Sequence, residues 1–339
     1  MRVIVTGGAG YIGGVVVAQL VEAGHDVVVY DNLSRGYREV VPAAARLVVG
    51  DVGDRASLDA AFAGHQPEAV LHFAAWIEAG ESMREPEKFF RNNTANALTL
   101  LETMLAHNVR RLVFSSTAAV YGDPEHIPIR ESDKLLPTNA YGESKLMVEQ
   151  MLAWFHRIHG FSCAALRYFN AAGATETLGE HHDPETHLIP IILQVASGQR
   201  SHISVFGDDY DTPDGSCVRD YVHVSDLASA HLLALDALHS RTAQPARLIY
   251  NLGNGQGFSV KEVIDCARRV TGHIIPAIIV PRREGDPATL VASSARISDD
   301  LGWKPRIPEL EEIVRSAWDY IQRKAKAGEL PACETGKAR

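Results

Sequence analysis

The sequence predicts an α/β protein with a doubly wound parallel sheet and a smaller C-terminal α/β substrate domain. Short β-branched runs alternate with helical patterns through the first half, and a glycine-rich turn directly follows the first run. Beyond about residue 170 the sequence becomes turn-rich and polar, with shorter strands and helices. Strands that alternate with helices form βαβ units, which place their strands parallel in one sheet.

The strands of the first half are expected to be buried on both faces, because their runs are almost wholly apolar. They cover residues 2–6, 27–31, 47–51, 69–74 and 111–116. Helical patterns cover 15–23, 93–106 and 141–158, and the second half adds a strand at 203–206 and a helix at 260–270. We expect a nucleotide-binding domain over 1–170, a substrate domain mainly over 171–325 with segments that return to the first, and a flexible tail over 326–339.

The composition argues against several classes of function. The net charge of -9 makes the surface acidic, which disfavours nonspecific binding to nucleic acid. No apolar run approaches the ~20 residues of a membrane span, and no signal peptide precedes the first strand. The 4 cysteines are scattered without a CxxC pair, which favours reduced thiols in a cytoplasmic protein. No residue is assigned to a metal.

The glycine-rich turn has the spacing of a dinucleotide-binding loop. Residues 8–13 read GAGYIG and fit GxGxxG, while Gly7, Gly10 and Gly13 fit the variant GxxGxxG. Glycines let backbone N–H groups at a helix N-terminus approach a diphosphate. Such a turn alone is weak evidence, but this one follows a strand, opens a helix, and precedes by about 20 residues an acid at a strand end. We therefore expect a Rossmann-type domain that binds a dinucleotide.

Asp31 is that acid, and it favours NAD over NADP. Its carboxylate would accept hydrogen bonds from the adenosine ribose and repel a 2′-phosphate. Arg35 and Arg38 lie nearby and oppose this preference slightly. Asp51, followed by Val52, is expected against the adenine, with a helix N-cap as the plainer alternative.

A proton-transfer group is predicted on the helix over 141–158. Tyr141 and Lys145 are four residues apart and share one helical face. An ammonium group and an oxidised nicotinamide would both favour the phenolate and lower a pKa that is ordinarily about 10. Thr117, at the end of the strand after Ser115, would hold the substrate hydroxyl. A YxxxK pair alone is usually a solvated helix face; the dinucleotide turn upstream favours the catalytic interpretation.

These residues resemble the extended short-chain dehydrogenase/reductase family, and within it the branch that epimerises UDP-hexoses at C4. The resemblance covers about residues 1–320 and is carried in the first half by residues 3–13, 30–34, 114–122 and 141–145. The most discriminating stretches lie in the second half, at 167–170, 206–215, 218–224 and 282–286.

The resemblance implies a seven-stranded Rossmann domain, tightly bound NAD and reversible C4 epimerisation of a UDP-hexose (UDP-galactose/UDP-glucose). Tyr141 would take the proton from the sugar 4′-hydroxyl while C4 gives a hydride to NAD⁺. The 4-keto sugar would rotate about the diphosphate linkage. It would then receive the hydride and the proton back on the opposite face. The protein would supply placement and electrostatics.

The resemblance also assigns residues to both ligands. The expected cofactor contacts are Gly7, Gly10, Tyr11, Ile12, Gly13, Asp31, Asn32, Ser34, Arg35, Gly36, Asp51, Val52, Phe73, Ala74, Ala75, Asn92, Ser115, Tyr141, Lys145 and Phe169. The expected substrate contacts are Thr117, Tyr141, Asn170, His187, Leu188, Val205, Phe206, Arg219, Arg283, Asp286 and Leu290. Arg219 and Arg283 would bind the diphosphate, which suits the guanidinium fork; a surface pair between Arg219 and Asp220 is the plainer alternative.

Three positions depart from the pattern of many relatives. Ile77 stands where they have a lysine that bonds the cofactor, and Thr117 replaces a serine without losing the hydroxyl. Leu290 stands at the position that gates the pocket near the sugar 2′-substituent. Its intermediate size predicts some turnover of UDP-N-acetylglucosamine.

There are three alternative functions: an enzyme with a different reaction, a 4-epimerase of a different sugar, and a protein without catalytic activity. A nucleotide-sugar 4,6-dehydratase would need an Asp-Glu pair after the threonine, where this chain has Ala118-Ala119. A 4-epimerase of another UDP-sugar (N-acetylhexosamine, pentose or uronate) stays open. An inactive binding protein conflicts with the intact Thr117, Tyr141 and Lys145. A homodimer is expected, because the helices over 93–106 and 141–158 carry more apolar surface than one sheet face needs.

Overall fold

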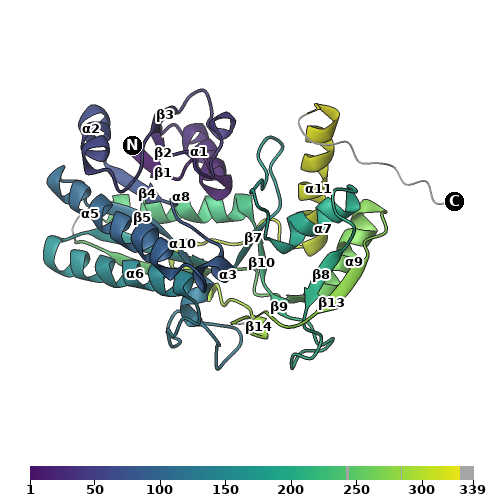
Figure 1. Cartoon of the computed structure of the whole chain (residues 1–339). Coiled ribbons are helices and arrows are strands. Elements are labelled where there is room, and N and C mark those ends of the chain that lie inside the picture. The colour runs from purple at the N-terminus through teal and green to yellow at the C-terminus, as the bar shows by residue number, and fades with distance from the viewer. Residues whose placement is uncertain (242–243, 284, 329–339) are drawn as a thin grey trace.

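The computed structural model describes residues 1–241, 244–283 and 285–328. Its larger half is built on β1 (Arg2–Thr6), β2 (Asp26–Asp31), β3 (Arg46–Val49), β4 (Ala69–His72), β5 (Arg111–Thr117), β6 (Ser162–Tyr168) and β11 (Arg247–Leu252). These form a seven-stranded sheet in the order β11-β6-β5-β4-β1-β2-β3, and every pairing between neighbours is parallel. The predicted doubly wound parallel sheet is therefore confirmed (Figure 1).

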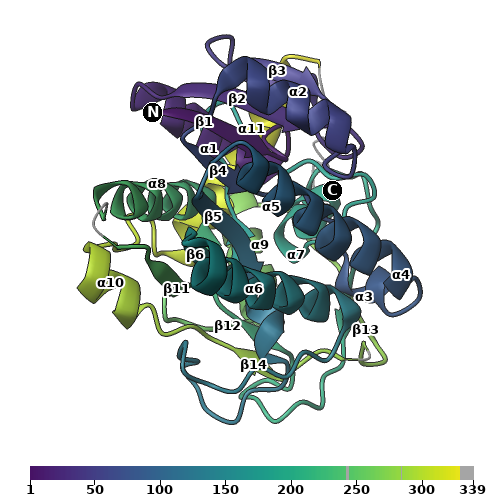
Figure 2. The same cartoon turned by 90° about the vertical axis from the view of Figure 1, so that its left-hand side faces the viewer.

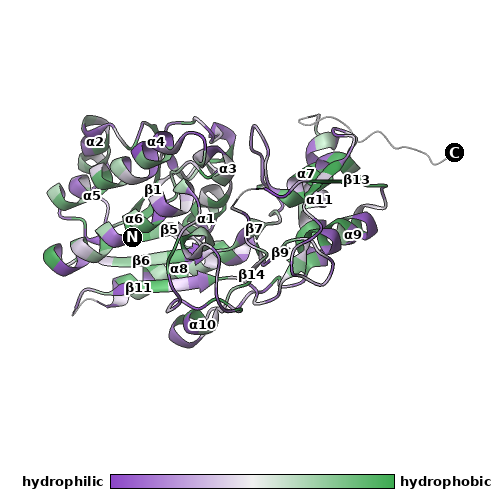
Figure 3. Cartoon of the chain, turned by 60° about the horizontal axis from the view of Figure 1, so that its bottom comes forward, coloured by the Kyte–Doolittle hydropathy of each residue, from purple (hydrophilic) through white to green (hydrophobic). Residues whose placement is uncertain are grey.

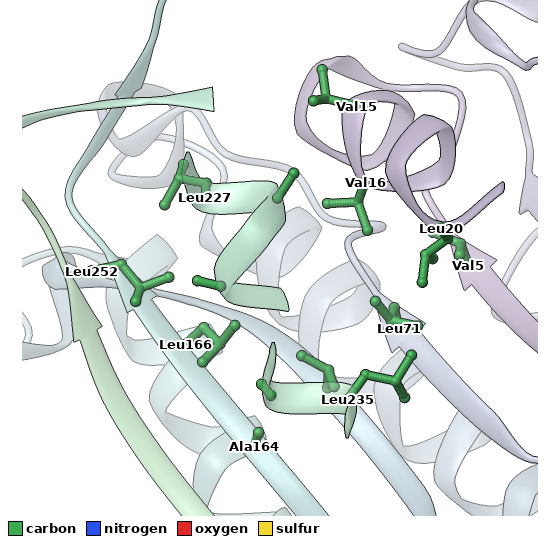
Figure 4. Packing of buried hydrophobic residues seen from close by; sticks show 14 of the residues in the cluster. Val5, Val15, Val16, Leu20, Leu71, Ala164, Leu166, Leu227, Leu235 and Leu252 are labelled. Atoms are coloured by element: carbon green, nitrogen blue, oxygen red, sulfur yellow. The ribbon is translucent and has the colours of Figure 1, made fainter. Parts of the chain in front are cut away.

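Helices cover both faces of this sheet. One face carries α1 (Tyr11–Glu22) and α8 (Val224–Ser240), and the other carries α2 (Arg55–His65), α5 (Asn96–Ala106) and α6 (Ala140–His159), as Figure 2 shows. Figure 4 shows how side chains of α1 and α8 meet the strands, among them Val16, Leu20, Leu235, Leu71 and Leu166. Burying each such side chain stabilises the fold by about 1.5–3 kcal/mol.

Short elements connect these layers near the carboxyl ends of the strands. They are η1 (Arg38–Val40), α3 (Ala79–Ser82), α4 (Pro86–Phe89), the π-helical turn η2 (Phe90–Ala95) and η3 (Ala118–Tyr121). The helix α10 (Ala295–Leu301) packs against β11. Figure 3 shows that the loops are mostly hydrophilic, whereas hydrophobic stretches follow the strands and the helices that cover them.

The smaller half has its own core, to the right in Figure 1. Helices α7 (Leu188–Ala196), α9 (Val260–Thr271) and α11 (Leu310–Lys326) share this core with β8 (Ile203–Phe206), and the more exposed β13 (Ala277–Val280) pairs with β8. Two small sheets join the halves: β7 (Asn170–Ala172) with β10 (Tyr221–His223), and β12 (Phe258–Ser259) with β9 (Val218–Arg219) and β14 (Thr289–Leu290). A capping box of Ser259 and Glu262 starts α9 and satisfies its first N–H groups.

Several predicted boundaries were wrong. Helix α1 begins at Tyr11 rather than at residue 15, because glycines are accommodated in its first turn. Strands β3 and β4 end at Val49 and His72, two residues early. The expected tail at 326–339 is wrong at Lys326, where the amphipathic α11 still continues; residues 329–339 lie outside the described part. None of the described helices is long and apolar enough to cross a membrane.

Candidate active site

The predicted site lies where the strand order reverses. In the sheet, β1 is flanked by β2 and β4, so consecutive connections leave toward opposite edges at this point. Ligands of open α/β sheets bind at such a switch point, beyond the carboxyl ends of the strands. The glycine turn follows β1, Phe73 and Ala74 follow β4, and Thr117 ends β5. Their common edge therefore gathers the residues that sequence motifs singled out.

The glycine turn is packed so tightly that side chains would not fit. A Cβ on Gly13 would lie 2.3 Å from the Gly7 carbonyl oxygen, so only glycine lets α1 start directly on the turn. The Gly14 N–H donates to the Gly10 carbonyl at 2.8 Å, which closes the first helical turn. The remaining N–H groups at a helix N-terminus lack partners within the helix and are available to an anion.

Asp31 ends β2 with part of its hydrogen-bonding capacity unused. Its two oxygens accept from the N–H groups of Ala9 at 3.0 Å and Leu33 at 2.8 Å. Burial raises the pKa of Asp31, and these two backbone bonds oppose that rise. A carboxylate has about four acceptor positions, so two remain for ribose hydroxyls.

Asp51 is not a helix N-cap, and that alternative is wrong. Asp54 caps α2 instead, accepting from the N–H groups of Ala56 and Ser57. Asp51 accepts from the Asn32 amide at 2.8 Å and the Gly53 N–H at 2.7 Å. It therefore ties the loop after β2 to the loop after β3, where the adenine was expected.

The loops around the turn hold the other predicted cofactor residues. Ser34 N–H donates to the Asn32 side chain at 3.0 Å, and a Cβ on Gly36 would lie 2.9 Å from the Ala9 Cβ, so this loop lies directly on the glycine turn. Arg35 forms an ion pair with Glu78 at 3.7 Å. Val52 is buried, whereas Ala75 and Ile77 are partly exposed in the loop after β4.

Asn93, the neighbour of the predicted cofactor residue Asn92, holds the loop after β4 in place. Its Oδ1 accepts from the Trp76 N–H at 2.8 Å, and its Nδ2 donates to the Trp76 carbonyl at 2.9 Å and to Ser144 Oγ at 3.0 Å. Asn92 donates to Asn93 at 3.0 Å and stays partly exposed. The π-helical turn η2 presents both residues, and π-helical turns are frequent at functional sites.

Tyr141 and Thr117 are brought together by a close approach of α6 to η3. Asn139 caps α6 by accepting from the Gly142 N–H at 2.8 Å. A Cβ on Gly142 would lie 2.5 Å from the Ala119 carbonyl oxygen, so glycine is required beside Tyr141. The Thr117 hydroxyl then lies within hydrogen-bonding reach of the phenol; its expected contact with the substrate hydroxyl stays a prediction.

Burial makes the Tyr141 phenol hard to ionise. It raises the pKa of Tyr141 to about 12, the Thr117 hydroxyl lowers it, and the carboxylate of Glu78 raises it. The expected lowering depends on an oxidised nicotinamide beside the phenol and stays a prediction. A cation bound beside the phenol would be needed to stabilise phenolate.

Lys145 is a buried cation without a counter-ion. Its Nζ donates to the Ser115 carbonyl at 2.8 Å and lies 4.9 Å from the centre of the Phe114 ring. No carboxylate among the described residues pairs with it, and burial lowers its pKa to about 7. An ammonium group has three donors, so two N–H groups remain for a ligand.

A buried ionic network behind β5 was missed by sequence reasoning. Arg167 donates from Nε and Nη2 to both oxygens of Glu149, at 2.9 and 2.6 Å, and from Nη1 to the Tyr121 hydroxyl at 2.9 Å. Ser116 donates to Glu149 at 2.5 Å, and Tyr121 donates to Asn251 at 2.7 Å. The available signal was the spacing of Tyr141, Lys145 and Glu149, which places all three along one face of α6.

The predicted substrate residues of the smaller half converge on Asp286. Arg219 and Arg283 lie 3.6 and 3.9 Å from its carboxylate. Arg283 also lies 4.4 Å from the centre of the Phe206 ring, which is 39% exposed. Two guanidinium groups and an accessible ring therefore meet at one place, as an anionic nucleotide requires.

Asp220 is not part of a surface pair with Arg219, and that alternative is wrong. Asp220 is fully buried and accepts from the N–H groups of Asn254 at 2.8 Å, Gly255 at 3.0 Å and Ala292 at 3.1 Å. Burial raises its pKa to about 6 against these bonds. Asp220 thus holds the strands that carry Arg219 in position.

The remaining predicted substrate residues lie between the halves or in the smaller core. Leu290 pairs with Arg219 in the β14–β9 ladder and packs against the cluster that contains Phe169. The Asn170 amide donates to the Asp220 carbonyl at 3.1 Å. Val205 is 2% exposed and packs in the core of the smaller half. His187 caps α7, which starts at Leu188.

The residues present fit a bound dinucleotide. The glycine turn is open at Gly10, where an added Cβ would meet only the Gly7 carbonyl oxygen, at 3.4 Å. Asp31 keeps acceptors for a ribose, and Lys145 keeps two donors and has no counter-ion among the described residues. A buried ammonium without partners is costly unless a ligand completes its hydrogen bonds.

Comparison with known proteins agrees with this geometry. Residues 3–253 match the model of the NAD dependent epimerase/dehydratase family. The chain belongs to this family. A UDP-glucose 4-epimerase of Halalkalibacterium halodurans is 51% identical over 322 residues, which are 94% of this chain and 95% of that protein. The family assignment confirms the predicted fold, the NAD cofactor and the enzyme class.

Solved structures of family members have the same fold. A crystal structure of a UDP-glucose 4-epimerase superposes with a TM-score of 0.91 at 48% identity, covering 96% of this chain and 98% of that one. The UDP-glucose 4-epimerase of Bifidobacterium longum, solved in complex with NAD⁺ and UDP, gives a TM-score of 0.90 at 37% identity and covers 97% of this chain and 99% of that one.

Proposed function

We propose that this protein interconverts UDP-hexoses at C4, with UDP-galactose and UDP-glucose as its substrate pair and NAD as a tightly held cofactor. The observation that carries the proposal is the convergence of Thr117, Tyr141 and Lys145 beyond the dinucleotide turn, with Arg219 and Arg283 supplied by the other half. Relatives with this activity are similar over almost the whole chain.

Bound NAD supplies a reversible two-electron acceptor for the sugar C4–H bond. Tyr141 Oη would accept the proton of the 4′-hydroxyl and later return it, and the sugar would end with no net oxidation because the hydride is returned as well. The Thr117 hydroxyl, which lies beside the phenol, would orient the sugar oxygen. Lys145 would hold the cofactor ribose with its two unused N–H groups, and its charge would stabilise phenolate beside it.

The smaller half would hold the nucleotide diphosphate while the sugar turns. Arg219 and Arg283 present guanidinium groups at 3.6 and 3.9 Å from Asp286, too far for strong hydrogen bonds, so both can bind phosphate oxygens without breaking a tight pair. Asp286 then takes a uridine ribose hydroxyl, and Phe206 packs on the base. Elimination chemistry is disfavoured, because Ala118 and Ala119 in η3 offer no acid or base.

The test is Tyr141→Phe assayed for conversion of UDP-galactose to UDP-glucose. Loss of the proton-transfer group should lower kcat by about 10²–10⁴-fold, whereas the phenyl ring keeps the packing. NAD should still copurify through gel filtration, which separates a chemical defect from a binding defect. Activity within a few-fold of wild type would show that the proton-transfer assignment is wrong.

We further propose that the protein works as a cytoplasmic homodimer of two-domain subunits divided near residue 170. Leu98 on α5 and Met147, Trp154 and Ile158 on α6 are exposed on neighbouring helices, with Trp154 at 60% and Ile158 at 63%. Exposed apolar helices of this kind favour a two-fold interface. The buried Cys163, Cys217 and Cys266 are unpaired, as expected of a reducing compartment. Light scattering on the purified protein tests the dimer.

A further inference from the structure

Four metal-ligating side chains meet at the edge of the proposed active site, and one of them, His187, is also a predicted substrate contact. Glu180, His182, Glu185 and His187 lie in the segment between β7 and α7, which connects the two halves in Figure 1. One ligand atom from each residue lies within 4.8 Å of the corresponding atoms of the other three. The sequence analysis assigned no metal ligand here, because the spacing of these residues matches no regular motif.

The distances fit the edges of a tetrahedron around a small cation. Nδ1 of His187 lies 2.9 Å from Oε1 of both Glu180 and Glu185. Nδ1 of His182 lies 3.3 Å from Glu180 Oε1 and 3.7 Å from Glu185 Oε2. Nitrogen and oxygen ligands about 2.0–2.1 Å from a tetrahedral zinc ion lie about 3.3–3.4 Å apart. The two His182 distances lie near that value, whereas the two 2.9 Å distances from His187 Nδ1 are hydrogen-bond lengths that a bound ion would lengthen.

One nitrogen of the cluster is buried without a hydrogen bond. His182 Nδ1 has no hydrogen-bonding partner among the described residues, although two carboxylate oxygens lie close to it. It faces these oxygens in a geometry that is wrong for donation to either. A nitrogen that lies close to carboxylate oxygens without donating to them has the position expected of a metal ligand.

The charges of the cluster also require a cation. The side chains of Glu180 and Glu185 are only 7% and 3% exposed. Two buried carboxylates are costly unless positive charge balances them. Either two protonated imidazoles or one divalent cation with neutral imidazoles gives a neutral cluster, and retention of zinc by the protein distinguishes the two.

We propose that Glu180, His182, Glu185 and His187 form a structural site for a divalent cation of the zinc class. All four positions come from the protein, as in closed sites that stabilise a fold rather than bind substrate. Two imidazole nitrogens and two carboxylate oxygens suit zinc better than magnesium or calcium, which take six or more oxygen ligands.

The place of the cluster suggests what the ion stabilises. The ring of Tyr11, at the start of α1, lies 6.5 Å from that of His182, and its hydroxyl donates to the Gly173 carbonyl at 2.6 Å. On the other side, His187 is followed by Leu188 at the start of α7. An ion here would fix the segment between β7 and α7, which lies against the start of α1.

Zinc content of the full-length protein tests the proposal. After incubation with ZnCl₂ and gel filtration, the wild type should retain about one zinc per chain by mass spectrometry, and its Tm should rise relative to EDTA-treated protein. His182→Gln and Glu180→Gln should each lower retained zinc at least tenfold and abolish the rise in Tm. Neither residue belongs to the proposed catalytic set, so both variants should keep bound NAD as evidence of folding.

His181→Gln is the matched control. His181 is the exposed neighbour of His182, and its ring packs on Tyr37 instead of facing the cluster. This variant should retain zinc like the wild type. The proposal is overturned if the wild type retains no zinc. Protonated imidazoles would then balance the charges of the two carboxylates. It is also overturned if all three variants lose zinc equally or none does, since binding would then be nonspecific.

Discussion

Two buried cations, Arg167 and Lys145, lie near β5, the strand that ends in Thr117. They differ in how fully their charge is compensated. Arg167 is 1% exposed and Lys145 is 3% exposed. Arg167 has a bidentate partner in Glu149 and a further acceptor in Tyr121, so that burial lowers its pKa but these contacts raise it overall. Lys145 has one carbonyl acceptor and no counter-ion, and burial lowers its pKa to about 7.

The difference separates a structural cation from a functional one. A buried charged group with a full set of hydrogen bonds fixes the packing around it. A buried charged group with unused donors lowers the stability of the fold until a ligand binds to them. Glu149 lies one helical turn beyond Lys145 and is 3% exposed. Glu149 therefore forms its ion pair with Arg167, although it lies only one helical turn from Lys145.

Lys145→Met should have the largest effect on activity and little effect on stability. It removes the ribose donor and the charge that favours phenolate, so kcat should fall about 10²–10⁴-fold. Unfolding in urea should show unchanged or increased stability, since an unpaired buried charge is lost. Arg167→Met is the matched change and should lower stability in urea much more than it lowers kcat. Similar losses of stability in both variants would contradict the assignment of Arg167 as structural and Lys145 as functional.

Glu149→Gln should destabilise the protein by about 3–5 kcal/mol, because it leaves the Arg167 cation buried without a counter-charge. The measurement is the urea midpoint and slope. Removing both charges in Glu149→Gln/Arg167→Met should recover much of the loss. A double variant no more stable than Glu149→Gln alone would mean that packing, not charge, dominates at this network.

The pH dependence of stability should reveal Lys145 in nucleotide-free protein. Its pKa is about 7 when folded and higher when unfolded, so the unfolded chain binds more protons between these values. Stability should then rise as pH increases above 7, by up to about 1.4 kcal/mol per unit for one proton. The difference between wild type and Lys145→Met in urea at pH 7 and 9 isolates this contribution; parallel curves would refute it.

Ser116→Ala should have the smallest effect. Ser116 is fully buried and donates to Glu149, whose oxygens remain bonded to Arg167 after the change. Stability should fall by about 1–1.5 kcal/mol, and kcat should stay within twofold. A large loss of activity would instead assign Ser116 to the catalytic group.

Local patterns predicted most of the fold and the catalytic group, because each depends on residues close in sequence. Apolar runs revealed the strands, and the spacing of Tyr141 and Lys145 revealed a shared helical face. The contribution of burial to the pKa of Tyr141 could not be predicted locally, since burial depends on the whole fold. The pairing of Glu149 with Arg167 and the cluster around His182 were missed, since both depend on contacts that no local periodicity encodes.

The position of α8 and β11 late in the chain matters during synthesis. Leu227 and Leu235 of α8 cover Leu166 of β6, as Figure 4 shows, and β11 pairs with the outer edge of that strand. Until residue 252 has left the ribosome, β6 keeps an apolar face and an unpaired edge, the features by which nascent chains aggregate or recruit chaperones. A chain that stops soon after residue 170 would therefore be a hazard to the cell rather than a small NAD-binding protein.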